Sequence, residues 1–592
     1  MSTEGNEKFT NKYHPDFVPG TINFMLDKVD ANNLQNMDKG SRLKITEKGI
    51  VLHPQPSDSP NDPLNWGRWT KLYQFILLCF ITGFTAATSN DAGAIQDSMN
   101  EIYNISYDSM NTGAGVLFAS IGLCTFILGP TSSLYGRKLT YVICIVLGLI
   151  GAIWFGYAKS TSDTIWSQLF VGASEGCAEA TVQLSISDMY FAHQLSGSLT
   201  VYILATSIGT YLGPLIAGFI VEYASFRWVG WSAAIISGGL ILVMAFTQYE
   251  TQFDRSKYYG KLDSSSIPRD SNKRLSNDDE KKKQDNNASE ELMSSSSFNS
   301  NRSNNSNAVV DPEAHAGVYG TGTEEVRISF WKRIQLITPS SNLQGTGFRQ
   351  YFKLLFLMLR VFWFPPVLLS GILWGLQDAF LTFYLTTEDN QYYDPPFSYS
   401  DTGVALMNIP CVIGAIIGCV YAGLFSDQVV LRIAKSRGGI HEAEDYLWML
   451  ITILIVNPIG LMVFAVGTDR EWDWRITYTV GLGFIGFSFG CAGDIAMSYL
   501  MSSYPEMILE GMIGVSLINN GIGCIFTFAC SPWLDAMGNT NTYAVLSALQ
   551  VAACLMIIPY MKYGKKMRLW TKDYYIRYIE ARDGVSSGIN KL

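Results

Sequence analysis

Charged residues are scarce in this chain. Only 16% of its 592 residues are charged, against about a quarter in an average soluble protein, and 48% are hydrophobic. This composition excludes a chain that is mainly solvated or disordered. The charges are also unevenly placed, because residues 71–249 and 350–561 contain 25 acidic and only 12 basic residues. The formal net charge of −9 therefore has its source in the two most apolar blocks of the chain.

Three further absences narrow the function. The five histidines are scattered without the spacing of metal ligands, which argues against a metal site. All ten cysteines fall inside the apolar runs described below, so no disulfide framework is expected. No apolar segment precedes residue 70, so we expect no cleaved signal peptide. We therefore expect no cofactor, no metal and no nucleic-acid partner.

Long apolar runs fill the two blocks. Each has about 20 residues, enough for a helix to cross the hydrocarbon core of a bilayer. The first six lie near residues 71–94, 109–130, 138–158, 163–187, 199–223 and 229–249. The other six lie near residues 361–386, 402–425, 446–467, 474–501, 511–534 and 542–562. A large soluble protein with buried helices is a poor alternative, because so many runs contain so few charges. The sequence predicts an all-α membrane protein with twelve transmembrane helices in two six-helix halves.

Polar segments separate and flank these halves. Residues 250–349 include SSSS, KKKQDNN and NSNRSNNSN, a composition that cannot bury enough apolar surface to fold. Apolar and basic residues near the end of this segment, at 343–360, are expected to lie along the inner membrane surface. The predicted parts are an N-terminal tail (1–70), an N-terminal bundle (71–249), a low-complexity central loop (250–349), a C-terminal bundle (350–562) and a C-terminal tail (563–592).

Basic residues near the span ends predict the orientation. With both termini in the cytoplasm, the cytoplasmic flanks hold eleven Lys or Arg residues and the external loops hold four. This orientation places Asn104-Ile-Ser106 outside, as a candidate glycosylation site. The external loops are acidic, with Asp97, Glu101, Asp108, Glu388, Asp389, Asp394, Asp401, Asp469, Glu471 and Asp473. These acids either concentrate cations at the mouth or are simply tolerated there.

Two motifs look catalytic. Residues 172–176 match the G-x-S-x-G nucleophile elbow, but that chemistry needs a strand, a turn and a helix, and this match lies inside a predicted membrane helix. Residues 481–486 match the G-x-G-x-x-G dinucleotide fingerprint, yet no strand precedes them. Close helix packing accounts for these glycines better. We therefore expect that the protein is not an enzyme.

A loop motif occurs at corresponding places in the two halves. Residues 129–138 read GPTSSLYGRK between spans two and three, and residues 423–427 read GLFSD between spans eight and nine. Together with the six-plus-six organisation, these motifs resemble the major facilitator superfamily. The resemblance implies a gate that holds the cytoplasmic helix ends together, formed by Gly129, Gly136, Arg137, Lys138, Gly423 and Asp427. Ser133 stands where that family usually has Asp, so we expect Asp427 to carry more of the latch.

Span five carries a second motif, GTYLGPLIAG at residues 209–218. Gly209, Gly213 and Gly218 favour the close approach of another helix, and Pro214 loosens the backbone ladder. The full string is similar to the motif of the fungal drug:proton antiporters in this superfamily, although a generic packing face would also account for the glycines. Gln168 in span four occupies a position where those relatives often carry an Arg. The proton-coupling machinery is therefore expected to differ from theirs.

Acidic residues occur inside several spans. Glu175 and Glu179 stand four apart in span four, on one helical face near the middle of the bilayer, where a charge is costly and seldom without function. Asp91, Asp378 and Asp494 lie in spans one, seven and ten. In the superfamily, spans one, four, seven and ten line the central cavity, and the cores of these spans contain no basic residue. We therefore predict an acidic cavity whose carboxylates lack a cationic partner.

Such a cavity suits an elongated polycation. We assign Glu175 and Glu179 to proton coupling, because burial favours the protonated carboxyl and a bound ammonium favours the ionised one. The residues assigned to substrate binding are Asp91, Asp378, Asp494, Trp374, Tyr384, Asn519 and Asn520. Aromatic residues in membrane helices are more often packing residues, so packing is the alternative role of Trp374 and Tyr384.

Two longer strings, YAGLFSDQVVLRIAKSRGGIHEAEDYLW and SISDMYFAHQ, resemble fungal plasma-membrane transporters of polyamines and histidinol. This resemblance implies a monomeric, proton-coupled carrier that takes up spermidine, spermine, putrescine and other organic cations across the plasma membrane. Two alternatives remain. The first alternative is a drug:proton antiporter that exports cationic compounds. The second is a sensor that binds polyamines without transporting them.

Overall fold

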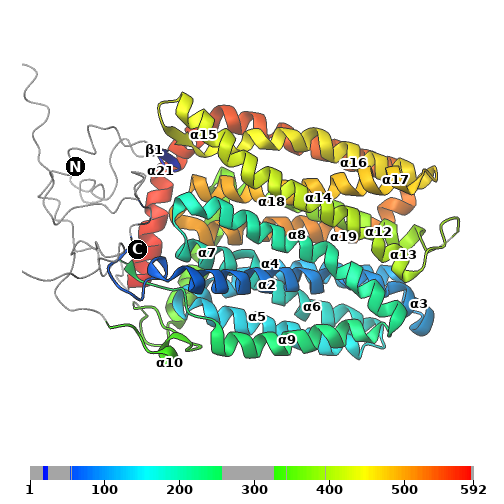
Figure 1. Ribbon diagram of the computed structural model, residues 1–592, viewed down its shortest axis with the longest axis horizontal. Helices are drawn as coiled ribbons and strands as arrows, with labels where there is room; N and C mark the ends of the chain where they lie inside the picture. The colour runs from blue at the N-terminus through cyan, green and yellow to red at the C-terminus, as the bar shows by residue number, and fades with distance from the viewer. Residues whose placement is uncertain are drawn as a thin grey trace, which may run out of the picture. The chain divides into compact units, whose positions relative to one another are not determined.

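Long helices that run side by side dominate the structure (Figure 1). The computed structural model describes residues 18–23, 52, 54, 56–255, 326–341, 343–393 and 395–587. Within these ranges, eleven helical segments are long and apolar enough to cross a membrane. The remaining predicted span, span four, is also present as the segment Thr161–Met189, which contains Glu175 and Glu179 and is not among these eleven apolar segments. The predicted all-α membrane architecture is confirmed.

The N-terminal half contains the first six spans. Its helices are α2 (Arg68–Asn90), α3 (Gln96–Tyr103), α4 (Tyr107–Leu134), α5 (Arg137–Gly156), α6 (Thr161–Cys177), η3 (Ala178–Val182), α7 (Gln183–Met189), α8 (Ala192–Tyr223) and α9 (Arg227–Thr247). Local sequence sets several of these ends. Ser160 and Asp163 form a reciprocal capping box at the start of α6. Gly136 adopts a φ of +103°, which lets the chain turn sharply from α4 into α5.

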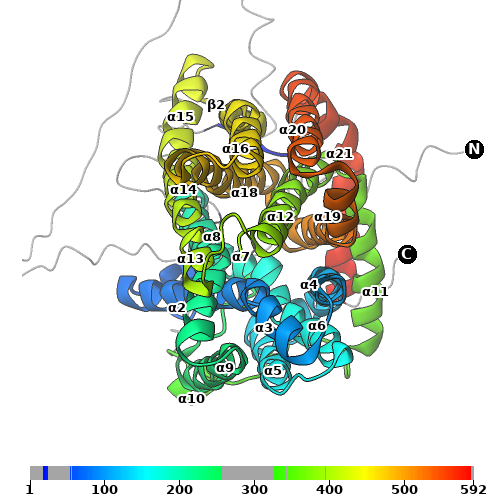
Figure 2. The same cartoon turned by 90° about the vertical axis from the view of Figure 1, so that its right-hand side faces the viewer.

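The C-terminal half contains the other six spans. Its helices are α12 (Pro365–Gln391), α13 (Asp401–Leu406), α14 (Asn408–Val420), η6 (Tyr421–Phe425), α15 (Ser426–Ser436), η7 (Ala443–Leu450), α16 (Ile451–Asp469), α17 (Trp474–Ile476), η8 (Thr477–Leu482), α18 (Gly483–Ser503), α19 (Ile508–Met537), α20 (Asn539–Leu555) and α21 (Ile557–Ser587). Figure 2 shows the helices of this half gathered in the upper part of the view and most of those of the N-terminal half below them. The halves meet where α4 packs against α19 and α8 against α14.

The ends of the predicted central loop are folded. Residues up to Arg255 and from Val326 onward are described, and they include α10 (Phe330–Arg333) and α11 (Phe348–Met358). The Nζ of Lys138 donates to the carbonyl of Ile334 at 2.8 Å, which ties one end of the loop to the N-terminal half. Residues 256–325, which contain the runs that predicted a low-complexity loop, lie outside the described residues, as does most of the predicted N-terminal tail.

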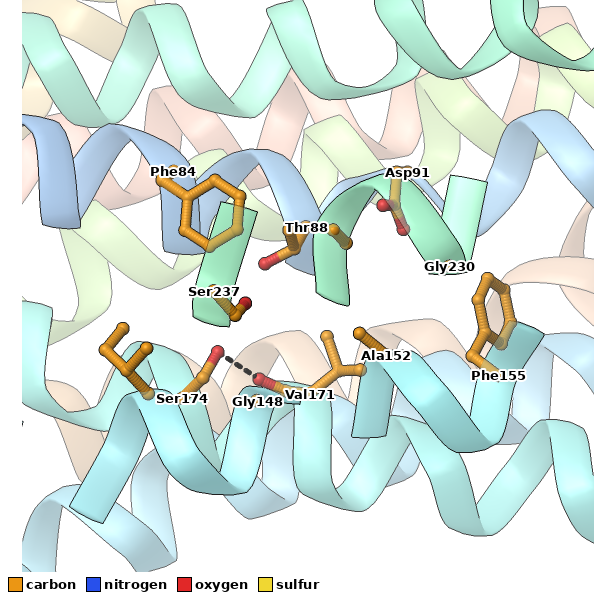
Figure 3. Close-up of a pocket in the computed structure, with 12 residues that line it drawn as sticks. Phe84, Thr88, Asp91, Gly148, Ala152, Phe155, Val171, Ser174, Gly230 and Ser237 are labelled. Carbon is orange, nitrogen blue, oxygen red and sulfur yellow. Dashed lines mark hydrogen bonds between the residues drawn. The ribbon is translucent and has the colours of Figure 1, made fainter. Parts of the chain in front are cut away.

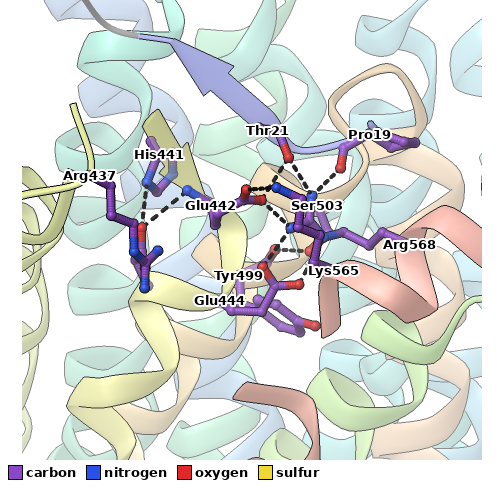
Figure 4. A network of polar contacts seen from close by, with 11 residues as sticks. Pro19, Thr21, Arg437, His441, Glu442, Glu444, Tyr499, Ser503, Lys565 and Arg568 are labelled. Carbon is purple, nitrogen blue, oxygen red and sulfur yellow. Dashed lines mark hydrogen bonds and ion pairs between the residues drawn. The ribbon is translucent and has the colours of Figure 1, made fainter. Parts of the chain in front are cut away.

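A polar network closes one end of the C-terminal half (Figure 4). Strand β1 (Thr21–Asn23) pairs antiparallel with β2 (Ile440–Glu442). Arg568 of α21 is 0% exposed and contacts Glu442 at 2.7 Å and Glu444 at 2.5 Å, and it also donates to the carbonyl of Pro19. We call the end of the bundle that holds β1, β2 and this network the terminal end. The end that holds α3, α13 and α17 is the opposite end (Figure 1).

Candidate transport site between the two halves

Glu179 lies where span four leaves regular α-helical geometry. Residues Ala178–Val182 form a single π-helical turn, η3, between α6 and α7. Such turns are rare in proteins overall, and those that occur often lie at functional sites. Asn520 of α19, in the other half, donates from Nδ2 to Glu179 Oε2 at 3.3 Å. Glu179 therefore faces the interface between the halves.

Two further carboxylates belong to the same group. Asp378 of α12 accepts a hydrogen bond from Asn519 Nδ2 at 3.1 Å, and Glu175 precedes Glu179 by about one helical turn. Glu175, Glu179 and Asp378 lie close enough to repel one another electrostatically. We call these three residues the central acids. In the described part of the chain, no Lys or Arg forms an ion pair with any of them, and their polar neighbours are amides and hydroxyls.

A second acidic pair lies closer to the terminal end. Thr200 of α8 donates from Oγ1 to Asp494 Oδ2 of α18 at 2.8 Å, which joins the two halves. Ser196, one turn earlier on α8, donates to Asp427 Oδ1 at 3.0 Å. Asp494 and Asp427 also repel each other. Asp494 is therefore separate from the central acids and forms part of the contact that closes the interface at this end.

Asp91 is in a different place from the other predicted acids. It lines a pocket inside the N-terminal half, between α2, α5, α6 and α9, together with Thr88, Ser174 and Ser237 (Figure 3). Its neighbours Ser89 and Asn90 instead line a cavity between the halves. The expectation that five acids converge on one cavity therefore needs correction, because the turn of α2 directs residue 91 away from the face that meets the C-terminal half.

The two predicted aromatic residues also separate. Tyr384 is buried inside the C-terminal half, where its hydroxyl donates to Asn408 Oδ1 at 3.1 Å and its ring lies 5.5 Å from that of Phe464. Its hydrogen bond is therefore made within its own half, while it also lies near Tyr211 of the N-terminal half. Trp374 packs 5.1 Å from Phe489, whose ring lies 5.7 Å from that of Tyr211 in the N-terminal half. Trp374 thus belongs to an aromatic row that crosses the interface.

Sequence reasoning missed Tyr211 as a site residue. It is 0% exposed, and its hydroxyl has no hydrogen-bond partner among the described residues. Tyr211 lies inside the span-five motif, which could have indicated its importance. The prediction from that motif used only its glycines and proline. An unsatisfied buried hydroxyl is costly, so this group is a candidate for contact with a substrate or water.

The cavity between the halves opens at the opposite end. Residues of α2, α4, α6, α12 and α19 line it, among them Asn111, Gln168, Thr386 and Asp389. Ser89, another lining residue, lies beside Glu175, so the cavity leads toward the central acids. Near the mouth, Asp389 is close to Asp97, and Tyr393 is close to both.

Glu388 and Asp389 were both predicted to lie in an external loop. The structure corrects this, because α12 continues to Gln391 and includes Glu388 and Asp389. Glu388 is only 3% exposed and accepts a hydrogen bond from Asn408 Nδ2 at 3.2 Å. Its second carboxylate oxygen has no hydrogen-bond partner among the described residues. Span seven is thus more acidic at its end than the apolar run indicated. Asp394, also predicted in that loop, lies outside the described residues.

The loop motif of the N-terminal half binds to its own half and to the folded end of the central loop. The backbone N–H groups of Arg137 and Lys138 each donate to the Glu250 carboxylate at 3.1 Å, and Arg137 forms an ion pair with Asp188 at 3.1 Å. Lys138 Nζ also donates to the carbonyls of Ala245, Gln248 and Ile334. Gly129 lies against the other half, because a Cβ there would overlap the side chain of Ile513 in α19.

The corresponding motif of the C-terminal half does cross the interface. Gly423 lies against Thr200 so closely that a Cβ there would overlap the threonine side chain. Asp427 accepts the Ser196 bond described above. The asymmetry matches the sequence, which has Ser133 at the position where the first motif would carry its Asp. A gating role for Asp427 remains a prediction.

The span-five motif packs α8 against its neighbours. A Cβ at Gly209 would overlap the backbone of Gly83, and one at Gly213 would overlap that of Ala87, both in α2. Gly218 lies against Ala405 of α13 in the other half. Pro214 lies within α8, which is continuous from Ala192 to Tyr223. These small residues therefore set the close approach of α8 to α2 and to the C-terminal half.

Comparison with known families decides the class. Residues 75–528 match the family profile of the Major Facilitator Superfamily. The chain belongs to this superfamily. The protein is thus a multi-pass membrane transporter and not an enzyme, and the two catalytic-looking motifs are helix-packing sequences: Gly172 packs on the backbone of Leu117 and Gly486 on that of Cys411.

Relatives cover almost the whole chain. Protein HOL1 of Saccharomyces cerevisiae is 53% identical over 592 aligned positions, which cover 98% of this chain and 100% of that protein. An uncharacterized MFS-type transporter of Schizosaccharomyces pombe is 45% identical over 97% of this chain and 96% of its own length. The MFS antiporter QDR3 of Candida albicans is 20% identical over 89% of this chain and 81% of its own length.

Proposed function

We propose that the protein takes up polyamines and other organic cations across the plasma membrane, coupled to protons, by alternating access of its two halves. The observation that carries the proposal is the group of central acids at the interface. Glu175, Glu179 and Asp378 are held by amides and hydroxyls, with no cationic side chain among the described residues to neutralise them. Carboxylates without a partner in a membrane helix are costly and mark ion or proton pathways.

The acids are arranged in succession between the two ends. Asp389 and Asp97 lie near the mouth at the opposite end, the central acids follow, and Asp494 and Asp427 lie nearest the terminal end. An elongated polyamine has ammonium groups separated by methylene segments, so it can engage successive carboxylates as it moves. A compact monovalent cation engages one level at a time. This succession favours a polycation as the substrate class.

Proton coupling follows from the same carboxylates. An empty, buried carboxyl favours its protonated form, and an arriving ammonium favours the ionised form and displaces the proton. Glu179 is the first choice for this role, because it lies in the π-helical turn and receives the Asn520 bond from the other half. Glu175 lies beside Ser89 on the cavity lining, and we assign it to the same role. Asn519 and Asn520 orient Asp378 and Glu179 for the cation.

The decisive experiment measures transport and its direction. Radiolabelled spermidine is supplied to cells that lack other polyamine carriers, with the external pH varied and a protonophore as the control. We expect label to accumulate inside, faster at acidic external pH, and accumulation to collapse with the protonophore. Export of preloaded label in exchange for protons would instead identify the drug:proton antiporter alternative, which the likeness to a protein named as an antiporter favours.

Reconstitution into liposomes distinguishes a carrier from a non-transporting sensor. Purified protein in liposomes is tested for spermidine binding and for flux under an imposed proton gradient. A carrier shows both, with flux that depends on the gradient. Binding without flux would support a non-transporting sensor and would overturn the proposal. Placement of the termini in the cytoplasm and a glycan at Asn104, which is an exposed residue after α3, are tested on the same protein by protease protection and by glycosidase treatment.

A further inference from the structure

Helix α11 and the turn that follows it, residues 348–363, cross from one half of the protein to the other. In Figure 2 the membrane spans are seen nearly end-on, whereas α11 is seen lengthwise at the margin of the bundle, beside α4 and α21. Tyr351 donates to the carbonyl of Ile127 in α4 at 2.6 Å, and Tyr574 of α21 donates to the carbonyl of Arg360 at 3.3 Å. We call residues 348–363 the bridge segment, because different halves hold its two ends.

One side of the bridge segment carries large apolar side chains that the protein leaves uncovered. Phe348 is 68% exposed, Phe356 is 66% exposed and Trp363 is 67% exposed. Phe352 lies between the first two, one turn from each, and is exposed as well. Leu354, on the other side of the helix, is buried against the bundle. The bridge segment therefore packs on the protein with one apolar side and presents another to its surroundings, as is typical of a site for membrane or protein contact.

A row of basic residues runs beside this exposed aromatic side. Arg349, Lys353 and Arg360 recur at a spacing that places them on one side of a helix. Arg349 and Arg360 are exposed, and neither forms an ion pair with another residue that the structure describes. The bridge segment itself contains no acidic residue. Its positive charge is thus not neutralised within its own sequence.

We propose that the bridge segment binds anionic phospholipid headgroups of the leaflet at the terminal end, with its exposed aromatic side among the acyl chains. Guanidinium groups bind phosphate through paired hydrogen bonds, and aromatic residues favour the boundary between headgroups and acyl chains. An amphipathic helix with Lys and Arg on one side and Phe, Trp and Leu on another lies in that boundary. Residues 343–360 were expected to lie along the inner membrane surface, and the proposal adds the class of headgroup and the residues that bind it.

The basic row is too long for a single phosphate. Arg349 and Arg360 are separated by about 16 Å along the helix axis, at about 1.5 Å per residue. The row therefore engages several headgroups side by side and does not form a closed pocket for one ion. Anionic lipids are concentrated in the cytoplasmic leaflet, which is the leaflet that the predicted orientation places at the terminal end.

A second copy of the chain fits this surface less well than lipid does. A symmetric dimer brings the same patch of both subunits together, so it would place two basic rows in one interface, where like charges repel. A phospholipid leaflet supplies negative charge for the basic row and acyl chains for the aromatic side at the same time. Charge complementarity thus favours anionic lipid as the occupant.

Native mass spectrometry of the purified full-length protein tests the proposal. The protein is titrated with phosphatidylserine and, separately, with phosphatidylcholine, and the affinity for each lipid is measured. We expect phosphatidylserine to bind more tightly. Equal affinities for the two lipids would overturn the proposal, as would a stable dimer that forms in place of the lipid complex. Displacement of phosphatidylserine by excess inorganic phosphate would identify a site for free anions and would also overturn it.

Charge variants locate the binding. Each charge removed from the row is expected to weaken phosphatidylserine binding about fivefold, so the double variant Arg349→Gln/Arg360→Gln should lose most of the preference. The variant Arg475→Gln is the matched control, because Arg475 is an exposed arginine beside an aromatic ring, 5.7 Å from that of Trp474, at the opposite end. It is expected to bind phosphatidylserine like wild type. Equal losses in the control and in the double variant would refute the assignment to the bridge segment.

A charge-conserving variant separates charge from folding. Arg349→Lys/Arg360→Lys keeps both positive charges and is expected to retain most of the preference for phosphatidylserine. If this variant loses the preference as fully as the glutamine variant does, the charge of the row is not what binds the lipid and the proposal fails. None of these outcomes depends on whether the protein transports polyamines.

Discussion

Glutamates occur in two contrasting settings in this protein. At the terminal end, Glu442 and Glu444 meet the buried guanidinium of Arg568, and Glu442 also meets Lys565 at 2.6 Å. At the interface, the polar neighbours of Glu175 and Glu179 among the described residues are amides, hydroxyls and another carboxylate. The same residue type therefore has opposite partners in the two regions.

The difference separates structure from function. A buried carboxylate that is paired contributes to the fold, and removal of its partner leaves an uncompensated charge that destabilises the protein. A buried carboxylate without a partner contributes nothing to the fold that an amide could not replace, so its retention points to a ligand that arrives from outside. Variants of the two groups are thus expected to fail in different assays.

The largest expected effect on transport is at the central acids. Glu179→Gln is expected to lower spermidine uptake by about tenfold or more, equivalent to at least about 1.4 kcal/mol, because an amide cannot take or release a proton. Glu175→Gln is expected to do the same. Surface expression and melting temperature should match wild type. Wild-type uptake in both variants would contradict the coupling assignment.

The largest expected effect on stability is at the terminal end. Arg568→Met is expected to destabilise the protein by about 3 kcal/mol, since it leaves Glu444 buried without its cationic partner and Glu442 with Lys565 alone. The melting temperature of the purified protein and its yield measure the loss. Lys565→Met is the control, because that side chain is 53% exposed and its ion pair is expected to contribute less than about 1 kcal/mol. Equal losses in both variants would refute the distinction.

Asp378→Asn tests whether Asp378 distinguishes polyamines from monovalent cations. The variant is expected to weaken spermine and spermidine binding about tenfold while a monovalent organic cation loses less, because only a polycation uses a second carboxylate. Competition against radiolabelled spermidine in liposomes supplies the affinities. The same loss for every cation would indicate that Asp378 only holds Asn519 in place.

Thr200→Val tests the contact between the halves near the terminal end. It removes the 2.8 Å bond to Asp494 without changing the size of the side chain, at a cost of about 1 kcal/mol. We expect the maximal uptake rate to change by about fivefold while spermidine affinity stays constant, because the bond joins moving halves and not the substrate. Thr206→Val, whose hydroxyl donates within its own helix, is the matched control. A change in affinity alone would argue that Asp494 binds substrate.

The smallest expected effect is on the pH dependence of stability. Burial raises the pKa of Glu442, but the hydrogen bonds from Lys565, Thr21 and Arg568 outweigh it and leave the pKa below its ordinary value. Ionised Glu442 thus stabilises the folded state above the ordinary glutamate pKa, and this contribution is lost as the pH falls through the lowered value. Melting temperatures from pH 7 downward should fall more in wild type than in Glu442→Gln. Parallel curves would contradict this.

Much of the fold followed from the sequence. The apolar runs predicted the twelve spans because a bilayer allows only a narrow range of helix lengths, and the repeated loop motif predicted the halves. The acids of span four were recognised because charge is rare in membrane helices. The extension of α12 to Gln391 was missed, since Glu388 and Asp389 end the apolar run while the backbone remains helical.

The sequence predicted the grouping of the site residues less well than it predicted the fold. Periodicity placed Glu175 and Glu179 on one face, but it could not place Asp91, which lines a pocket inside the N-terminal half although the adjacent Ser89 and Asn90 line the cavity between the halves. Tyr384 is an aromatic residue of the kind that can bind a cation, but its hydroxyl donates a hydrogen bond to Asn408 inside its own half. A single helix shows which residues share a face, but its rotation within the bundle depends on every helix packed against it.

By itself, the sequence determined the membrane class, the two halves and the unusual acidity of the spans, because hydrophobic length and charge cost act on each segment locally. Only the tertiary structure decided which acids meet. It brought Glu179 to Asn520 and Thr200 to Asp494 across the interface, and it placed Asp91 in a pocket inside the N-terminal half. These pairings join residues 341 and 294 positions apart, and they arise from the close packing of glycine-bearing helices, which no local pattern encodes.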